Sequence, residues 1–451
     1  MKRIAILGAG ESGLGAALLA KKQGYAVWVS DAGTIADSRK EQLQAAGIPF
    51  EEGTHDVEKL LSCELIVKSP GIPPTAEVVK KVADQGIPLI DELEFAYRYS
   101  SGKVIAITGT NGKTTTTLLT YHLLLQAGWD VGLAGNVGKS WAAQLLEKDH
   151  AWWVIEVSSF QIDGFQTFKP YIAILTNITP DHLDRYGYEM DRYIQSKMGL
   201  FQHMGPEEKA ICYLEDAYTS RGMHLKPMQA ELYGISLTKK QEKGGYCGGE
   251  TLEIAVDGRN LQIPVTQLSI QGKHNVLNAL CAGVAAALAG LSELQISSGY
   301  STFTNAPHRM EVIRTCEGVT YINDSKGTNV ESTFYALSSF KQPILWIAGG
   351  VDKGNDYSQL SSVVDGGRVK VLICLGKDNE KLKKAFGGIL PKILETQSME
   401  EAIHWSQDLA QKGDVVLLSP ACASFDLFKN YEDRGYQFRV AVEKLTQKQE
   451  A

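Results

Sequence analysis

The chain has few features of secreted, membrane or nucleic-acid-binding proteins. Its seven cysteines are scattered without CxxC spacing, a pattern typical of reduced thiols in a cytosolic protein. The longest apolar run, residues 279–291, is shorter than the ~20 residues that a membrane-spanning helix needs. The opening residues read as a β-strand rather than as a secretory leader. We therefore expect a cytoplasmic protein without a membrane partner.

Charge and composition exclude further classes of protein. The net charge of −7 and the lack of a Lys/Arg run argue against an extended nucleic-acid surface. No residue-level repeat or low-complexity tract is present. The hydrophobic (44%) and charged (22%) fractions are those of an ordinary globular protein, and 451 residues are too many for one core. The chain should therefore fold into two or three domains.

Strand-like and helix-like segments alternate along the chain. Short apolar runs typical of buried parallel strands occur at 4–7, 26–30, 65–67, 104–108, 152–157, 172–176, 344–348, 371–375 and 415–419. The pattern restarts near residues 98–102 and again near Pro307. We predict an α/β protein of three domains that span residues 1–99, 100–304 and 305–451.

The pattern changes between residues 205 and 265. Two alternating runs flank Asp257-Gly258 and predict a β-hairpin over 252–263. The glycine-rich residues 244–249 look like a surface loop, and residues 275–291 predict a long buried helix.

The segment Ile105-Ala-Ile-Thr-Gly-Thr-Asn-Gly-Lys-Thr-Thr115 joins a short apolar run to glycines, a Lys-Thr pair and a predicted helix. Glycines allow backbone N–H groups to surround phosphate oxygens, and the helix N-terminus adds partial positive charge. Lys113 would reach the terminal phosphates, and the Thr114 hydroxyl would ligate Mg²⁺. Ile107 stands where the full Walker A spacing has glycine, so the motif is a shortened form. We predict a nucleoside triphosphate site here rather than a turn that binds nothing.

A second glycine motif, Gly8-Ala-Gly10-Glu-Ser-Gly13, follows the first predicted strand and precedes a helix. Asp31 ends the next strand, where an acid can bind a ribose. The motif leaves three interpretations open: a nicotinamide dinucleotide, another diphosphate-containing ligand, or a purely structural turn. Ser69-Pro70-Gly71 follows a later strand and would lie near the same ligand.

Other polar groups also follow predicted strands. Glu156 ends a buried strand in the domain of the phosphate loop, which is the usual place for a Mg²⁺ ligand. The loop 176–185 contains several metal- and phosphate-competent side chains, although His182 taken alone would be a capping or core histidine. Lys197 taken alone would be a solvated helix lysine.

The last third of the chain has weaker signals. Segments 272–278, 307–309 and 323–329 each join polar groups to the boundary of an element, and each is equally compatible with a cap and with a ligand contact. Segment 419–426 follows the last predicted strand. Its Cys422 has no histidine nearby in the sequence, so we do not expect a nucleophilic thiol.

Taken in order, these motifs resemble those of the Mur ligases, the ATP-dependent amino-acid ligases of peptidoglycan precursor synthesis. The resemblance is carried by Thr108-Gly-Thr-Asn-Gly-Lys-Thr114, Glu156-Val-Ser-Ser-Phe-Gln161, Asn177-Ile-Thr-Pro-Asp-His-Leu-Asp184, His274-Asn-Val-Leu-Asn278, Pro307-His-Arg309 and Asn323-Asp-Ser-Lys-Gly-Thr-Asn329. The tail from Leu418 to Gly435 looks most like the D-glutamate-adding members. The resemblance spans essentially the whole chain and implies a role in cell-wall biogenesis, cell shape and division.

The resemblance implies a Rossmann-like N-terminal domain for a UDP-sugar, a central P-loop ATPase domain with a parallel sheet, and a Rossmann-like C-terminal domain. It assigns the first glycine motif to UDP rather than to NAD. The implied UDP-substrate ligands are Gly10, Glu11, Ser12, Gly13, Leu14, Asp31, Ser69, Pro70, Gly71, Asn136 and Ser158. The implied ATP ligands are Gly109, Thr110, Asn111, Gly112, Lys113, Thr114, Thr115, Asn278, Arg309 and Asp324.

The resemblance also implies the metal and amino-acid sites. The implied ligands of two Mg²⁺ ions are Thr114, Glu156, His182 and Lys197, the last as a carbamate formed with CO₂. Lys113, His182 and Lys197 are the implied catalytic residues. The implied D-glutamate ligands are Lys326, Thr328, Lys353, Ser424 and Tyr431. Tyr431 stands where we expect Phe, and segment 349–353 varies around its lysine, which puts single D-glutamate contacts in question but not the reaction.

The implied reaction ligates D-glutamate to UDP-N-acetylmuramoyl-L-alanine, by a monomer with no nucleic-acid partner. ATP would convert the unreactive carboxylate of the acceptor into an acyl phosphate, which the amine then attacks. Three alternatives stay open at this point: an L-alanine-adding or peptide-recycling Mur-type ligase, a nicotinamide-dependent oxidoreductase, and a motor-type P-loop ATPase. A ligase should release phosphate only when both small substrates are present.

Overall fold

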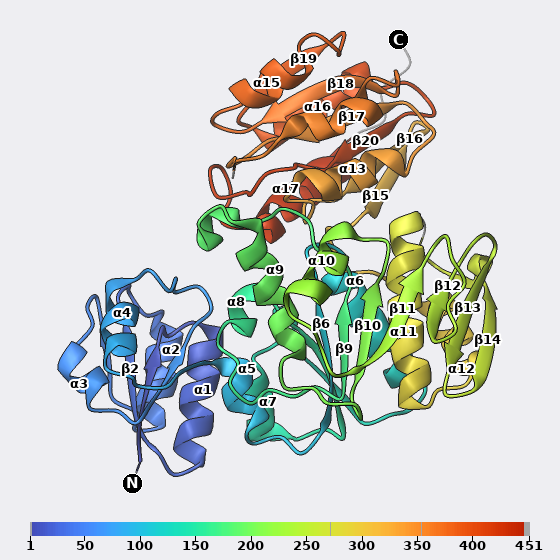
Figure 1. Cartoon of the computed structure of the whole chain (residues 1–451). Helices are drawn as coiled ribbons and strands as arrows, with labels where there is room; N and C mark the ends of the chain where they lie inside the picture. Colours follow the sequence, from blue (N-terminus) through green and yellow to red (C-terminus); the bar gives the residue numbers. More distant parts are fainter. Residues whose placement is uncertain (1, 271, 353, 446–451) are drawn as a thin grey trace. The chain divides into compact units, whose positions relative to one another are not determined.

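A computed structural model describes residues 2–270, 272–352 and 354–445. Three β-sheets follow one another along the chain (Figure 1). The chain forms two compact units, of which the first holds residues 1–269 and 275–303 and the second holds residues 270–274 and 304–451. The first two sheets belong to the first unit and the third sheet to the second. The exact boundaries expected near residues 99 and 304 stay a prediction.

The first sheet is parallel throughout, in the order β3-β2-β1-β4-β5. Its strands are β1 (Arg3–Leu7), β2 (Ala26–Asp31), β3 (Phe50–Glu52), β4 (Leu65–Lys68) and β5 (Leu89–Asp91). Its helices are α1 (Glu11–Lys22), α2 (Asp37–Ala45), α3 (Val57–Leu61), α4 (Glu77–Asp84) and α5 (Glu92–Tyr97). The order reverses at β1, so the carboxyl ends of β1 and β4 form the edge where ligands of such sheets bind.

The central sheet has the order β14-β13-β12-β11-β10-β9-β6-β8-β7, and only its β12–β13–β14 end is antiparallel. Its strands are β6 (Lys103–Thr108), β7 (Val131–Gly135), β8 (Trp152–Glu156), β9 (Ile172–Leu175), β10 (Lys209–Tyr213), β11 (Glu231–Ser236), β12 (Gly244–Tyr246), β13 (Thr251–Val256) and β14 (Arg259–Pro264). The helical segments of this region are α6 (Lys113–Gln126), α7 (Trp141–Glu147), α8 (Ser159–Ile162), η1 (Leu183–Tyr186), α9 (Met190–Met198), η2 (Gly199–Phe201), α10 (Ala217–Leu225), η3 (Val265–Gln267), α11 (Lys273–Ala289) and α12 (Glu293–Thr302).

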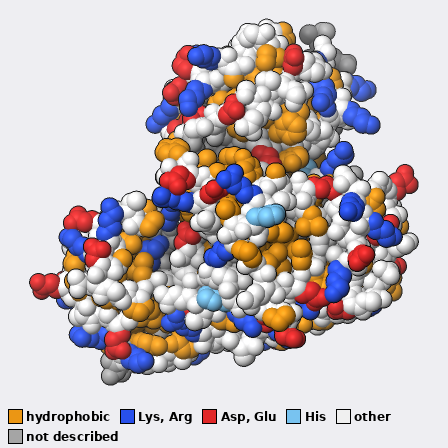
Figure 2. Space-filling view, in the orientation of Figure 1, with side chains coloured by type: hydrophobic (Ala, Val, Ile, Leu, Met, Phe, Trp, Pro, Cys, Tyr) orange, Lys and Arg blue, Asp and Glu red, His pale blue; other side chains and the backbone are white. Residues whose placement is uncertain are grey.

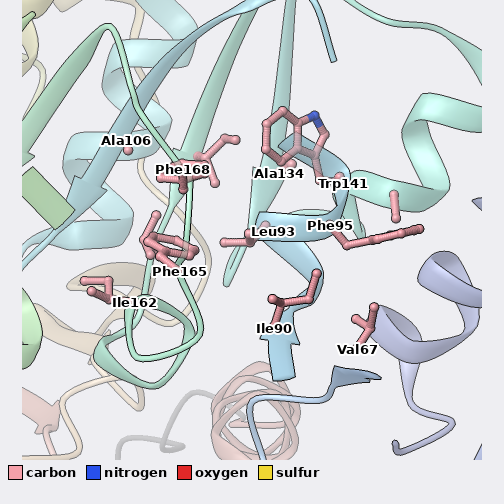
Figure 3. Close-up of a cluster of buried hydrophobic side chains, with 14 of the residues drawn as sticks. Val67, Ile90, Leu93, Phe95, Ala106, Ala134, Trp141, Ile162, Phe165 and Phe168 are labelled. Atoms are coloured by element: carbon pink, nitrogen blue, oxygen red, sulfur yellow. The ribbon is translucent and has the colours of Figure 1, made fainter. Parts of the chain in front are cut away.

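One hydrophobic core is shared by the first two sheets. It joins Val67 and Ile90 of the first sheet to Trp141 and Phe168 of the central region, with Phe95 of α5 between them (Figure 3). Trp141 and Phe168 pack edge to face, with ring centroids 6.4 Å apart. Burial of large aromatic side chains stabilises an interface strongly, so this core fixes the two sheets of the first unit to each other.

The third sheet has the order β15-β16-β20-β17-β18-β19, with β15 antiparallel and the others parallel. Its strands are β15 (Glu311–Cys316), β16 (Val319–Asn323), β17 (Ile344–Ala348), β18 (Val369–Leu375), β19 (Ile393–Thr396) and β20 (Val415–Leu418). Its helical segments are α13 (Val330–Ser338), η4 (Tyr357–Leu360), α14 (Ser361–Val364), α15 (Glu380–Phe386), α16 (Met399–Leu409) and α17 (Tyr431–Glu443).

Both faces of the third sheet are covered. Trp346 of β17 packs with α13, α14 and α15, whereas its neighbours Leu345 and Ile347 pack with α16 and α17. A strand buried on both faces needs apolar residues at every position, which explains the continuous apolar runs of the sequence.

Two expectations for the region between residues 205 and 265 have different outcomes. The hairpin is confirmed as β13 and β14, and its turn residues Asp257 and Gly258 both have positive φ, 48° and 75°. The prediction of a surface loop at residues 244–249 is wrong for 244–246, because these form β12 with Gly244 and Gly245 buried, whereas Gly248 and Gly249 are exposed outside the strand. A Cβ on Gly244 would lie 2.0 Å from the carbonyl oxygen of Gly234, so glycine here allows close strand pairing rather than a loop.

Among the described residues, no helix combines the length and hydropathy needed to cross a lipid bilayer. On the face drawn in Figure 2, the acidic and basic side chains of the described residues are interspersed. The absence of a nucleic-acid partner stays a prediction.

Candidate active site

The phosphate loop lies between β6 and α6, as the sequence predicts. Gly109 and Gly112 have φ of 146° and 82°, conformations that favour glycine. A Cβ at Gly109 would lie 1.9 Å from Thr176 Oγ1, and one at Gly112 would lie 2.3 Å from Asn278 Oδ1. The two glycines therefore bring the loop against β9 and α11, which places the predicted ATP ligand Asn278 beside it.

Asn177 and Thr179, which follow β9, hold the loop from one side. The Thr110 and Asn111 backbone N–H groups donate to the Asn177 carbonyl and to Asn177 Oδ1, both at 2.9 Å. Thr110 Oγ1 accepts a hydrogen bond from the Thr179 N–H at 2.9 Å. The next two predicted ligands, Thr114 and Thr115, are buried in the first turn of α6. These hydrogen bonds fix the shape of the phosphate loop.

The start of α6 is electrostatically suited to an anion. Its N-cap is Gly112, no side chain caps it, and its first turn contains no acid. The partial positive charge of the helix N-terminus is therefore not neutralised by a carboxylate of its own first turn. Lys113 adds a full positive charge, and its Nζ donates to the carbonyl oxygens of Gly109 (2.8 Å) and Thr110 (2.7 Å).

Two lysines converge on one carbonyl oxygen. Lys197 on α9 is 2% exposed, and its Nζ donates to the same Gly109 oxygen at 2.7 Å. Burial, and secondarily the charge of Lys113, hold the pKa of Lys197 well below its ordinary value. No carboxylate of the described residues forms an ion pair with Lys197. The expectation that Lys197 taken alone would be a solvated helix lysine is therefore wrong, because α9 packs this side chain inside the unit.

Glu156 ends β8 and is 1% exposed. Its Oε1 accepts a hydrogen bond from Asn136 Nδ2 at 2.7 Å, which unites two predicted site residues from neighbouring strand ends. Its Oε2 is buried and has no hydrogen-bond partner among the described residues. Burying an unsatisfied carboxylate oxygen is costly, and a bound cation would remove that cost.

The donor set around the phosphate loop fits Mg²⁺ bound largely by phosphates and water. No three His, Cys, Asp or Glu side chains form a metal-binding group in the described part of the chain. Mg²⁺ commonly takes one or two protein oxygens and keeps the rest of its coordination for substrate phosphates and water. In the described residues, the unpaired Glu156 oxygen is available for such a role.

His182 follows β9 in a left-handed conformation, with φ of 51°. Its side chain is 42% exposed, lies edge-on to Phe160 with ring centroids 5.1 Å apart, and has Asp181 Oδ2 at 3.6 Å from Nε2. It is therefore not a core histidine. The predicted UDP ligand Ser158 is the N-cap of α8, because its Oγ accepts a hydrogen bond from the Gln161 N–H.

A pocket of about 680 Å³ opens at the carboxyl edge of the first sheet, and four predicted UDP ligands line it: Gly10, Asp31, Ser69 and Gly71. Asp31 Oδ2 accepts a hydrogen bond from the Ala9 N–H at 2.6 Å, so the acid also holds the glycine loop. His55, just before α3, and Lys81 of α4 line the same pocket and were missed, because nothing in the sequence places these segments beside the glycine motif.

The other predicted UDP ligands are not among the described residues that line this pocket, and Asn136 and Ser158 belong to the central region. Glu11, Ser12, Gly13 and Leu14 form the first turn of α1. A Cβ on Gly13 would lie 1.8 Å from the Gly8 carbonyl oxygen, so this glycine permits the helix to start against the loop. The Pro70 carbonyl accepts a hydrogen bond from Arg185.

In the second unit, the predicted ATP ligand Asp324 follows β16, and Arg309 precedes β15. Asp324 is buried and accepts hydrogen bonds from Ser419 Oγ (2.9 Å) and the Met310 N–H (3.2 Å). Burial raises the pKa of Asp324 to about 6, although the nearby positive charge of Arg309 opposes the shift. The Nε of Arg309 is buried without a hydrogen-bond partner in the described residues. The predicted ATP ligands are thus divided between the two units.

Of the predicted D-glutamate ligands, Lys326 and Thr328 follow β16, Ser424 follows β20, and Tyr431 begins α17. Lys326 Nζ is 5.2 Å from the centre of the Tyr431 ring, Thr328 is half-buried, and Ser424 is buried. Lys353 lies outside the described residues. These assignments stay predictions.

Arg434 organises these loops and was not predicted. It is 1% exposed, and its guanidinium donates to the carbonyl oxygens of Ser325 (2.8 Å), Cys422 (3.2 Å) and Gly349 (3.3 Å). Burial lowers the pKa of Arg434 to about 10 and raises the pKa of the Cys422 thiol to about 11. The second shift agrees with the expectation that Cys422 is not a nucleophile.

Comparison with known families and proteins gives a consistent result. The chain matches the MurD N-terminal domain over residues 3–78, the Mur ligase middle domain over 107–286 and the Mur ligase glutamate ligase domain over 308–422. It is 46% identical to a UDP-N-acetylmuramoylalanine–D-glutamate ligase of Christiangramia forsetii over 98% of this chain and 100% of that protein. It is 48% identical to the ligase of that name in Cytophaga hutchinsonii, over 98% of this chain and 99% of that protein.

Solved structures agree in fold. A pseudomurein peptide ligase type C from Methanothermus fervidus has a TM-score of 0.62 at 20% identity, over 99% of this chain and 100% of that one. The UDP-N-acetylmuramate-alanine ligase MurC of Thermotoga maritima has a TM-score of 0.60 at 17% identity, over 98% of this chain and 99% of that one. At these identities the likeness concerns the fold alone.

Proposed function

The chain belongs to the Mur ligase family, and we propose that it joins D-glutamate to UDP-N-acetylmuramoyl-L-alanine with ATP. The acceptor carboxylate attacks the γ-phosphorus of ATP, which releases ADP and leaves an acyl phosphate. The neutral amine of D-glutamate then attacks the acyl carbon, and the tetrahedral intermediate expels inorganic phosphate as the amide forms.

The observation that carries this proposal is the concentration of positive charge at the start of α6 beside the unpaired oxygen of Glu156. The first step joins two anions, so catalysis consists mainly of positioning and charge neutralisation. Lys113 neutralises the terminal phosphates, and Asn136 orients the acceptor carboxylate. Two Mg²⁺ ions, with Thr114, Glu156 and His182 among their ligands, would neutralise phosphate charge when bound.

We further propose that Lys197 is carbamylated. The buried amine adds to CO₂ and loses a proton, which replaces a cation with an anion that can ligate a metal. The support is positional: the side chain is buried, forms no ion pair in the described residues, and shares one carbonyl oxygen with Lys113. Conversion of Lys197 from a cation to an anion would replace its repulsion from Lys113 with an attraction.

The remaining assignments complete the proposal. UDP occupies the pocket of the first sheet, and D-glutamate contacts the predicted residues of the second unit. The domains span 1–99, 100–304 and 305–451. The chain acts as a monomer in the cytoplasm. Light scattering of the purified protein measures its molar mass in solution and so tests the oligomeric state.

The decisive experiment measures phosphate release from ATP with UDP-N-acetylmuramoyl-L-alanine and, in turn, D-glutamate, L-glutamate, L-alanine or L-lysine. We expect release only when D-glutamate is present together with the acceptor. Preference for another amino acid would replace the substrate assignment, and release without any small substrate would indicate a simple ATPase. Acceptor labelled with ¹⁸O in its carboxylate should transfer one label to phosphate, and phosphate without label would refute the acyl phosphate.

The carbamate has its own test. Lys197→Ala should abolish activity, and removal of bicarbonate should lower wild-type activity reversibly. A ¹³C signal of a carbamate should appear in wild type with ¹³C-bicarbonate and be absent from the variant. Full activity of Lys197→Ala would refute the proposal.

A further inference from the structure

Arg185 reaches from the central region to the loop after β4. It lies in η1, three residues after His182, and its Nη2 donates to the carbonyl oxygens of Pro70 (2.7 Å) and Ile72 (3.2 Å). This loop contains Ser69, Gly71 and Ile72, which line the pocket of the first sheet. A single side chain thus joins the wall of that pocket to the loop that carries a predicted metal ligand.

The same loop is also held from inside its own domain. Lys68, the last residue of β4, donates through Nζ to the carbonyl oxygens of Ser69 (3.1 Å) and Ile72 (2.9 Å). Lys68 therefore fixes the shape of the loop without help from the central region. Arg185 adds a different constraint, because it ties the loop to an element beyond the first sheet.

The position of Arg185 is itself well determined. Its guanidinium carbon lies 3.8 Å from the centre of the Phe160 ring, and the same ring packs edge-on against His182. Phe160 belongs to α8, directly after the predicted site residues of β8. Stacking on an aromatic face and donation to two carbonyl oxygens both exploit the planar guanidinium, a geometry that lysine does not reproduce.

We propose that Arg185 is a positioning residue: on the frame that the shared core provides, it holds the loop after β4, which forms one wall of the UDP pocket, in place relative to the phosphate loop. It aligns the acceptor carboxylate, at the far end of the bound substrate, with the γ-phosphate. The identity of that substrate rests on the proposed function. Because a small misplacement of reacting groups slows a reaction strongly, loss of this link should reduce turnover more than nucleotide binding.

The test compares four substitutions. Arg185→Met removes the link between the two regions, and Lys68→Met removes the support inside the first domain. Arg185→Lys keeps a positive charge without the planar fork. Arg192→Met is the matched control, because Arg192 is an exposed residue of the neighbouring helix α9, paired with Glu189 at 2.9 Å. Calorimetric titration with UDP measures the pocket alone, and steady-state kinetics measure the full reaction.

Arg185→Met should bind UDP within threefold of wild type while kcat falls at least tenfold and the KM for ATP stays unchanged. Lys68→Met should weaken UDP binding at least fivefold. Arg185→Lys should lie between wild type and Arg185→Met in kcat, and Arg192→Met should match wild type. If Arg185→Met melts far below wild type, Arg185→Lys replaces it as the test. The positioning role then predicts that Arg185→Lys keeps its affinity for UDP while its kcat falls.

Two results would overturn the positioning role: unchanged kcat in Arg185→Met, or a loss of UDP affinity as large as the loss of kcat/KM. These results are distinct from a failure of the proposed function. A wild-type protein that is inactive with every amino acid refutes the function, whereas an active wild type with an equally active Arg185→Met refutes only the positioning role.

Discussion

The two glycine loops of the first unit have the same local design but different electrostatics. Each follows a parallel strand and precedes a helix whose N-cap is a glycine without a side-chain cap. The helix after the first loop begins with Glu11, and Asp31 binds that loop through the Ala9 N–H. The helix after the second loop begins with Lys113 and has no acid in its first turn. The buried Lys197 donates to the same carbonyl oxygen of this loop as Lys113 does.

The two loops thus share the glycines that shape them and differ in the charges beside them. Asp31 and Glu11 place carboxylates beside the first loop, and a carboxylate can accept hydrogen bonds from ribose hydroxyls. Lysines around the second loop can neutralise the terminal phosphates. Four predictions follow from this contrast, ordered by the size of the expected effect.

Lys113→Met should reduce kcat/KM about a thousandfold, because removal of a preorganised positive group from a phosphoryl-transfer site has effects of this order. Phosphate release from ATP in the presence of both substrates measures the change. UDP binding should stay at the wild-type level, since Lys113 belongs to the other loop. A variant that retains a tenth of wild-type activity would show that charge at the second loop is not decisive.

Gly13→Ala should lower the free energy of unfolding by about 3 kcal/mol, because its Cβ would meet a backbone carbonyl at 1.8 Å and the structure would have to shift. Gly10→Ala is the matched control, since no atom lies within 4 Å of its Cβ and its φ is −66°. Urea unfolding of both variants measures the difference. Equal stability of the two variants would contradict the packing argument.

Glu92 should make stability pH-dependent. It is 2% exposed, and burial, assisted by the charge of Glu11, raises its pKa from the ordinary 4.5 to about 7. The folded state therefore binds a proton that the unfolded state has lost between these pH values. The free energy of unfolding should fall by about 3 kcal/mol as the pH rises from 4.5 to 7 and then stay level.

Glu92→Gln should flatten this pH dependence and raise stability at pH 8, because the amide keeps an acceptor for the Ala142 N–H, now 2.7 Å from Glu92 Oε1. The midpoints of urea unfolding of wild type and Glu92→Gln at pH 5.5, 7 and 8 measure this pH dependence of stability. The exposed Glu64→Gln is the control and should keep the wild-type slope. A wild-type stability that rises over this range would contradict the assignment.

Asp31→Asn should have the smallest effect, a rise of about fivefold in the KM for the UDP-linked substrate with unchanged kcat. Asp31 accepts hydrogen bonds from the Ala9 N–H through Oδ2 (2.6 Å) and from the Gly33 N–H through Oδ1 (2.8 Å), so asparagine keeps one of these bonds and loses the other. Loss of one charge-assisted hydrogen bond is worth about 1 kcal/mol. A change in kcat instead of KM would assign Asp31 to the chemical step.

Much of the fold could be predicted because the parallel strands are buried on both faces. Their continuous apolar runs, such as the one at β17, are visible in the sequence without any tertiary information. The strand β12 could not be predicted in this way. Its two buried glycines carry no apolar signal, and only the close approach to Gly234 shows why they are there.

The candidate site was predictable to different degrees. The phosphate loop and Glu156 stand at strand ends, where spacing along the chain is enough to identify them. Arg185 and Arg434 each bind carbonyl oxygens of segments more than eighty residues away, and no local pattern indicates such bonds. The burial of Lys197, which makes its chemistry unusual, likewise depends on how α9 packs.

The sequence by itself determined the order of the α/β elements, the two glycine loops and the chemical types of the groups at strand ends, because these follow from short-range periodicity and spacing. The tertiary structure decided which of those groups are desolvated and which share a partner. In the part of the chain that the structure describes, two lysines on one carbonyl oxygen, a buried carboxylate oxygen without a hydrogen bond, and an arginine that reaches the loop after β4 arise only when distant segments pack together, since desolvation and charge interaction depend on distance in space.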